Sequence, residues 1–282
     1  MKTIHFAYSK VPNMGDLLNE LVMDRLFHVP YVHETSVFRY ELTGIGSFLQ
    51  NIFAGTETNF KGKIKRIIYQ HCPYPCYVWG TGFLQDYTNI KTRISRNDVV
   101  FMAVRGRLTQ KSVENIIGQQ INPVLGDGGI ITPMFVKKCE TKYKIGLIPH
   151  FREIDCENVS YIVEKYPDCH IIDLRKDPIS VIEEISSCET VLSSSLHGLI
   201  LSDAYRIPNM RIKLTDAPRG GDFKFSDYYS AYNLAISATS INSTEDVPDI
   251  NTIIDKYLIT DGMVNTMQHG MFKTIEEYIN NR

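Results

Sequence analysis

The chain has 282 residues, of which 43% are hydrophobic and 22% are charged, with 18 glycines and 12 prolines. This is the composition of an ordinary globular protein, so collagen-like, low-complexity and disordered chains are excluded, and the length suggests about two domains. The 30 Lys and Arg residues against 32 Asp and Glu residues leave a net charge of −2, which argues against a nucleic-acid-binding protein.

Short apolar runs alternate along the chain with segments of helical periodicity. The expected strands are 3–8, 76–80, 98–104, 144–150, 169–174 and 189–194, and the expected helices are 15–27, 108–117, 159–166, 178–187 and 196–205. Strands of about five residues that alternate with helices of about ten residues predict βαβ units and parallel sheets.

The polar segment 137–144 precedes a fresh strand and indicates a domain boundary near residue 138. We expect an α/β protein with two Rossmann-like domains facing a cleft, residues 1–138 and 139–260. A C-terminal helix over 261–282 is expected to pack back on the domains. Ligands of open α/β sheets bind beyond the carboxyl ends of the strands, so the cleft is the expected site.

The six cysteines are too few for a disulfide scaffold. His71 precedes a C-x-x-x-C pattern of Cys72 and Cys76, but no second cluster supports zinc, so no metal is expected. The N-terminal segment lacks the features of a secretory signal, and no apolar run approaches about 18 residues. A cytoplasmic protein with at most peripheral contact with the inner face of a membrane is expected.

Three serines, Ser193 to Ser195, separate a predicted strand from a predicted helix. The N–H groups and hydroxyls of such a turn point out of the helix N-terminus and form an anion site, so Ser194, Ser195 and Leu196 are candidate substrate-binding residues. His197 is a candidate for proton transfer, because the helix dipole disfavours the imidazolium. The alternative is that a serine only caps the helix and His197 is structural.

The loop after the first predicted strand contains Asn13 and Asp16. Asp16 can cap the following helix by accepting a hydrogen bond from the N–H of Asn19. Alternatively, Asp16 or Asn13 faces the cleft and orients or deprotonates an acceptor hydroxyl, since the loop lies at the carboxyl end of a strand.

Three further groups are candidates for substrate binding. Arg105 ends a buried strand and can hold a carboxylate or phosphate, or it bridges carboxylates at the surface. His150 ends the strand 144–150. The segment 216–234 contains Arg219, two glycines, Lys224 and paired aromatic residues; it is either a mobile loop that closes on a ligand or an aromatic-anchored connection.

Eight segments resemble, in order, motifs of the polysaccharide pyruvyl transferase family. They are NMGDLLNE, LTGIGSFL, YVWGTGF, MAVRGRLT, VLGDGGIITP, GLIPHF, VLSSSLHGLILSDAYRIP and FKFSDYYS. The resemblance runs from about Asn13 to Ser230 and implies a fold similar to the GT-B glycosyltransferases, with the acceptor on the first domain and the donor on the second.

The resemblance also implies a reaction. Phosphoenolpyruvate, as donor substrate and without a cofactor, transfers its three-carbon unit to two hydroxyls of a sugar and forms a cyclic pyruvate ketal in capsular or exopolysaccharide biosynthesis. The acceptor is expected to be a sugar, free or part of a lipid-linked oligosaccharide. The family's histidine corresponds to His197 and its V-R-G arginine to Arg105. His197 is the expected acid, which protonates the methylene carbon or the leaving phosphate.

Two departures from the family pattern keep other functions open. Some members have an arginine where this chain has Ser195, so Lys224 or Arg219 is expected to supply the missing charge. The family's GDPAL-like segment is here Gly-Asp-Gly-Gly-Ile at residues 126–130. The alternatives are a GT-B type glycosyltransferase that uses a nucleotide-sugar, because the same architecture accepts such donors, and a non-catalytic sugar-binding relative.

Overall fold

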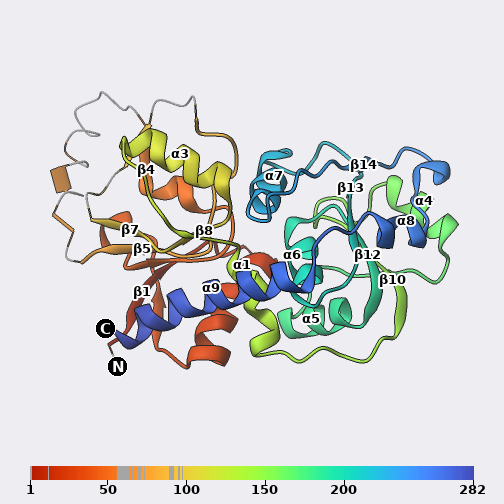
Figure 1. Cartoon of the computed structure of the whole chain (residues 1–282), viewed down its shortest axis with the longest axis horizontal. Helices are drawn as coiled ribbons and strands as arrows, with labels where there is room; N and C mark the ends of the chain where they lie inside the picture. The colour runs from red at the N-terminus through yellow and green to blue at the C-terminus, as the bar shows by residue number, and fades with distance from the viewer. Residues whose placement is uncertain are drawn as a thin grey trace.

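Two five-stranded parallel sheets form the two halves of the molecule in the computed structural model (Figure 1). The structure describes residues 2–11, 13–55, 64, 67–68, 71–72, 74–88, 92–94, 96 and 98–282. The predicted α/β class with two Rossmann-like units is therefore confirmed. The expected boundary near residue 138 falls in the connection that leads from one half to the other.

The first sheet has the order β2-β1-β3-β5-β7, with all its pairs parallel. Its strands are β1 (Ile4–Ala7), β2 (Tyr31–His33), β3 (Leu42–Thr43), β5 (Cys76–Val78) and β7 (Val99–Phe101). The expected strand 98–104 is divided, because β8 (Ala103–Val104) leaves β7 and pairs in parallel with β9 (Val124–Leu125). A further pair, β4 (Phe53–Gly55) and β6 (Thr92–Ile94), is antiparallel.

The first helix follows β1 as the periodicity predicts. Helix α1 (Met14–Leu21) continues into the wider π-helical turn η1 (Val22–Phe27) and buries Met14, Leu18 and Val22 in the core. The other helical elements of this half are η2 (Val37–Arg39), η3 (Leu49–Ile52), α3 (Arg107–Ile117) and η4 (Gly128–Met134).

The second sheet is also entirely parallel and has the order β11-β10-β12-β13-β14. Its strands are β10 (Tyr143–Ile148), β11 (His170–Ile171), β12 (Cys188–Ser193), β13 (Asn209–Lys213) and β14 (Thr239–Ser240). The helical elements of this half are α4 (Asn158–Lys165), α5 (Pro178–Ser186), α6 (Leu196–Ala204), α7 (Phe223–Ser230), η5 (Thr244–Asp246) and α8 (Ile250–Asp255). As its periodicity predicts, α5 buries Val181, Ile182 and Ile185.

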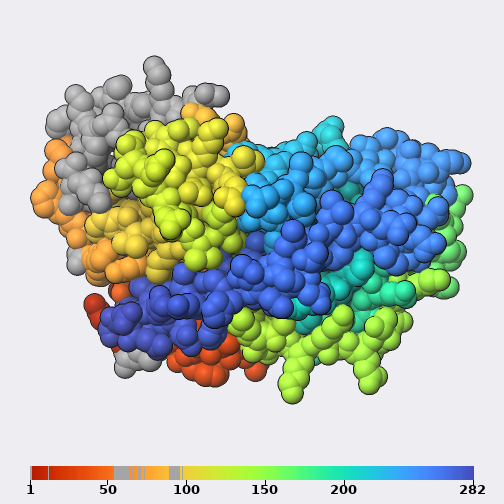
Figure 2. Space-filling view, in the orientation of Figure 1, coloured from red at the N-terminus to blue at the C-terminus, as the bar shows by residue number. Residues whose placement is uncertain are grey.

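The last helix, α9 (Asp261–Asn280), lies across the seam between the two halves (Figure 2). Gln268 Nε2 donates to the carbonyl oxygens of Ile130 in the first half and Ala204 in the second. The indole of Trp79 donates to the carbonyl of Met271 at 3.0 Å. The helix therefore fastens the halves together. None of the described helices has the length and apolar character needed to cross a bilayer.

Candidate active site

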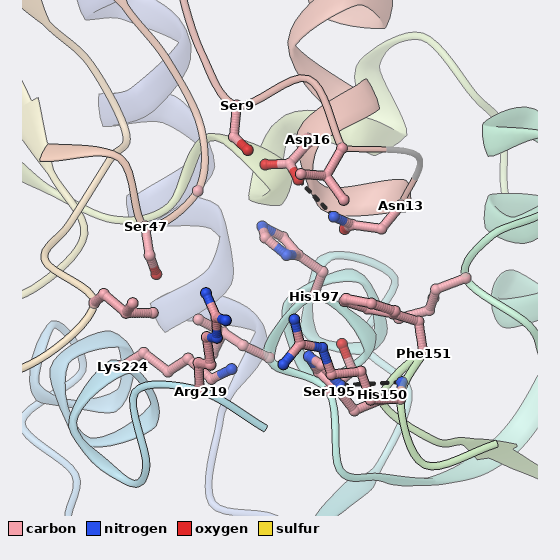
Figure 3. Close-up of a pocket in the computed structure, with 16 residues that line it drawn as sticks. Ser9, Asn13, Asp16, Ser47, His150, Phe151, Ser195, His197, Arg219 and Lys224 are labelled. Atoms are coloured by element: carbon pink, nitrogen blue, oxygen red, sulfur yellow. Dashed lines mark hydrogen bonds between the residues drawn. The ribbon is translucent and has the colours of Figure 1, made fainter. Parts of the chain in front are cut away.

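A pocket of about 300 Å³ opens between the halves, where the carboxyl ends of both sheets meet (Figure 3). The first half lines it with Ser9, Val11, Asn13, Asp16, Gly46, Ser47 and Leu84. The second half lines it with His150, Phe151, Arg152, Leu174, Ser195, Leu196, His197, Arg219 and Lys224. These residues follow the ends of strands in both sheets, which is where parallel sheets bind their ligands.

His197 projects from the first turn of α6 into this pocket, toward Asp16 and Asn13 (Figure 3). Burial, together with the positive charges of Lys224 and Arg105, lowers the pKa of its imidazole to about 3. The imidazole is therefore neutral near pH 7. A neutral imidazole can accept a proton, and the role of His197 as the acid stays a prediction.

Asp16 lies in the first turn of α1, with its carboxylate facing the pocket. The expected capping role is wrong: the cap is Asn13, whose side-chain oxygen accepts from the N–H of Gly15, while its Nδ2 donates to the Asp16 carboxylate. Burial raises the pKa of Asp16 to about 7, although the side chains of Asn13 and Ser9 act to lower it. Near neutral pH, Asp16 therefore exchanges a proton readily.

Cationic side chains face these two groups from the second half of the molecule. Lys224 is 7% exposed, and among the described residues no carboxylate lies within salt-bridge distance of its ammonium. Burial, together with the charges of Arg105 and Arg211, lowers the pKa of Lys224 to about 8. The exposed Arg152 and Arg219 complete a positive rim on the pocket.

Lys224 reaches the pocket from a helix and not from a loop. The segment predicted as a mobile loop or an aromatic-anchored connection contains α7, which buries Phe225 and Tyr228. Arg219 lies in the loop before this helix. The two cations expected to replace the family arginine at Ser195 thus both line the pocket.

The serines of the turn before α6 have different positions relative to the pocket. Ser195 stands at the N-cap of α6 without a capping hydrogen bond from its side chain, and both it and Leu196 line the pocket. Ser194 does not line the pocket: its hydroxyl donates to the buried Glu153 at 2.6 Å and accepts from the N–H of His150 at 2.8 Å. Ser194 therefore holds the loop after β10 in place from behind the pocket.

His150 is in the pocket, beside the ring of Phe151 at a centroid distance of 4.5 Å. Burial, together with the charges of Lys224 and Arg152, lowers the pKa of His150 to about 4. A neutral imidazole at this position can form hydrogen bonds with a ligand without adding to the positive rim.

Arg105 does not line the pocket, which corrects its expected role as a direct substrate anchor. It is fully buried, and its guanidinium donates to Asp227 at 2.9 Å, to the carbonyl of Phe83 at 2.6 Å and to the hydroxyl of Ser47 at 2.9 Å. Asp227 belongs to α7 and also accepts from Thr109. Arg105 thus lies behind the pocket wall and joins Ser47 to the helix that carries Lys224.

Several lining residues were not singled out in the sequence. They are Ser9, Val11, Gly46, Ser47, Leu84, Phe151, Arg152 and Leu174. Their common signal is position, since each follows the carboxyl end of a strand. The strand β3, which precedes Gly46 and Ser47, has only two residues and too little periodicity to mark that end. Among the described residues, no cluster of His, Cys, Asp or Glu suited to a metal ion occurs.

Comparison with known proteins finds one segment that matches a family model. Residues 133–213 match the model of the polysaccharide pyruvyl transferase family. The resemblance seen in the sequence is confirmed for this part of the chain. The matched segment runs from η4 to β13 and contains His150, Ser195 and His197; Asp16 and Lys224 lie outside it.

Two individual proteins are similar to the chain. An uncharacterized protein, L143, of Acanthamoeba polyphaga mimivirus is 28% identical over 138 residues, which are 46% of this chain and 47% of that protein. The chain thus spans about half the length of this curated relative. An uncharacterized protein of Klebsiella pneumoniae with a solved structure is 14% identical, with a TM-score of 0.43 over 80% of this chain and 87% of that one.

Proposed function

We propose that the protein is a pyruvyl transferase that moves the three-carbon unit of phosphoenolpyruvate onto two hydroxyls of a sugar, forming a cyclic pyruvate ketal in exopolysaccharide or capsule biosynthesis. One observation carries this proposal. A buried lysine and the N-terminus of α6 face a carboxyl of pKa about 7 and a neutral histidine within a single pocket. An anion site beside an acid and a base suits this donor and this reaction.

The charges of the pocket match the donor. Phosphoenolpyruvate carries a carboxylate and a phosphate, and its binding site needs several positive groups. Lys224, Arg219 and Arg152 line the pocket, and the first-turn N–H groups of α6 have no acceptors within the helix. The donor therefore binds on the second half of the molecule, without a cofactor.

The two proton-transfer groups divide the chemistry. Asp16, protonated in part near pH 7, donates its proton to the methylene carbon, which becomes a methyl group and leaves an oxocarbenium-like centre at the neighbouring carbon. A sugar hydroxyl attacks this centre and transfers its proton to His197. Phosphate then leaves with the proton that His197 accepted, which restores the neutral imidazole. The second hydroxyl attacks the new oxocarbenium-like centre and transfers its proton to the Asp16 carboxylate, so both groups return to their starting state. The products are the ketal and inorganic phosphate.

The acceptor enters from the side of the first half. Asn13 and Ser9 offer hydrogen-bonding groups there, and the ring of Phe151 offers an apolar face of the kind that packs against a sugar. The acceptor is a sugar, free or at the end of a lipid-linked oligosaccharide that a cytoplasmic enzyme would meet at the inner face of a membrane.

The test is phosphate release from phosphoenolpyruvate by the purified protein, with and without galactosides, mannosides and glucosides. The expected result is acceptor-dependent release and a product heavier by one pyruvate less one water. Asp16→Asn and Lys224→Met are expected to abolish release, while Lys273→Met on the outer face of α9 is the matched control. Stabilisation by a nucleoside diphosphate, with no stabilisation by phosphoenolpyruvate and no phosphate release, would overturn the proposal in favour of glycosyl transfer.

A further inference from the structure

The glycine-rich turn before η4 carries Asp127, a carboxylate that the proposed chemistry leaves without a role. Asp127 is fully buried, and its Oδ1 accepts from the N–H of Gly129 at 3.0 Å. The same Oδ1 lies 3.9 Å from His197 Nε2. Asp127 belongs to the first half and His197 to the second, so the pair spans the seam between them.

Each of these two side chains has one polar atom without a hydrogen-bond partner among the described residues. Asp127 Oδ2 and His197 Nε2 are buried, and neither has a hydrogen-bond partner in the part of the chain that the structure describes. Buried polar atoms are nearly always satisfied, and an exception calls for an explanation. The gap between the carboxylate and Nε2 exceeds a hydrogen bond by about 1 Å, and catalytic hydrogen bonds that are long in a free enzyme often shorten when the ligand binds.

The other ring nitrogen of His197 has different surroundings. Nδ1 lies against Gly15, in the first turn of α1. The positive end of a helix dipole favours a nitrogen that carries a lone pair and no proton. The favoured tautomer of His197 therefore carries its proton on Nε2, which faces Asp127. Nδ1 is unprotonated and faces the pocket.

The packing around the glycine-rich turn at residues 126–129 holds the Asp127 carboxylate in place. A β-carbon on Gly128 would stand 2.6 Å from Ile45 Cγ1 and 2.7 Å from the ring of Trp79, so the backbone is pressed directly against the core of the first half. On the other side, Ile200 of α6 lies close to Gly129. The glycines of this turn allow the close approach of η4 to α6 that brings Asp127 to the imidazole.

We propose that Asp127 is the positioning residue of His197: its carboxylate accepts the Nε2–H of the imidazole, turns Nδ1 toward the substrate and stabilises the imidazolium that forms when Nδ1 takes a hydroxyl proton. Asp127 stays ionised throughout, and the proton on Nδ1 passes on to the departing phosphate. The catalytic part of this inference rests on the proposed pyruvyl transfer; the tautomer of His197 does not.

The first experiment needs no substrate. ¹⁵N NMR of the histidine rings at pH 7.5 is expected to show His197 protonated on Nε2 in the unmodified protein and shifted toward the Nδ1–H form in Asp127→Asn. Asp203→Asn is the control: this carboxyl is also fully buried, but it is bound to Asn209 and Tyr228 within the second half, so its loss leaves the His197 signals unchanged. An Nδ1–H form in the unmodified protein, or unchanged signals in Asp127→Asn, would overturn the inference.

The second experiment separates positioning from simple support of the fold. Asp127→Asn is expected to lower kcat for phosphate release at least about tenfold, with KM for phosphoenolpyruvate within twofold, as the loss of an orienting carboxylate does. In a His197→Gln background the same substitution is expected to cost nothing more. An equal loss in that background would mean that Asp127 acts independently of His197. If no pyruvyl transfer is found, the NMR result still decides the pairing.

Discussion

The imidazole of His197 lies directly against the backbone of Gly15, with Nδ1 only 2.0 Å from the position that a β-carbon on residue 15 would take. The two residues come from opposite halves of the molecule. The N-terminal turns of α1 and α6 can therefore approach the same pocket only because residue 15 is a glycine. Any side chain there must displace the imidazole, because the backbone of α1 is fixed by the core packing of Met14 and Leu18.

Gly15→Ala is therefore expected to displace His197 from the pocket and to lower kcat by at least about tenfold, since small misplacements of reacting groups are costly. Gly262→Ala is the matched control, because its β-carbon meets only Thr260 Oγ1 at 3.9 Å in the first turn of α9. Steady-state phosphate release by both variants checks the expectation. Full activity of Gly15→Ala would show that the ring position does not matter.

The pH dependence of the rate follows from Asp16. The carboxyl must be protonated to act as the acid, and burial raises its pKa to about 7, so kcat/KM should fall as pH rises through about 7. Well below that pH the Asp16 carboxyl is fully protonated, and a fall in rate on the acid side is expected from Asp127, whose pKa burial raises to about 6. The measurement is a kcat/KM profile between pH 5 and pH 9. A rate that increases through pH 7 would instead identify Asp16 as a base.

Arg105 and Lys224 are expected to behave in opposite ways when they are replaced. Arg105→Ala leaves the buried Asp227 carboxylate and the Phe83 carbonyl without their guanidinium partner, and this should cost about 3–5 kcal/mol of unfolding free energy. Lys224→Met removes a buried charge that has no ion pair among the described residues, so stability is retained while affinity for phosphoenolpyruvate falls.

Urea unfolding and binding titrations on the same two proteins distinguish these outcomes. Loss of affinity without loss of stability in Arg105→Ala would restore Arg105 as a direct anchor of the donor. Strong destabilisation in Lys224→Met would make Lys224 a structural residue.

Gln268 of α9 is expected to contribute to the stability of the whole molecule. Gln268→Ala leaves the carbonyls of Ile130 and Ala204 without their shared donor, which should cost about 1–3 kcal/mol. The exposed Lys273→Ala on the same helix serves as the control and should change stability by less than about 0.5 kcal/mol. Denaturant unfolding of both variants provides the comparison, and equal midpoints would show that α9 does not hold the halves together through Gln268.

Local pattern was sufficient for most of the fold. The runs that became β1, β10 and β12 are apolar enough to be strands in almost any context, and the stripes of α1 and α5 require a core on one side. The strands β2 and β3, with three and two residues, are too short for a pattern, and they form because β1 offers both edges for pairing. The helix α7 follows paired glycines that favoured a loop, and it forms because Phe225 and Tyr228 are buried.

The candidate site was likewise predictable from the sequence only in part. Residues at the carboxyl ends of strands, such as Asp16 and His197, could be chosen in advance because parallel sheets bring those ends to one edge. The sequence alone could not show that Arg105 is buried, that Asn13 and not Asp16 caps α1, or that Asp127 faces His197. These features depend on how the two halves of the molecule meet. That arrangement arises from contacts between residues more than 100 positions apart along the chain, such as Trp79 with Met271 and Arg105 with Asp227.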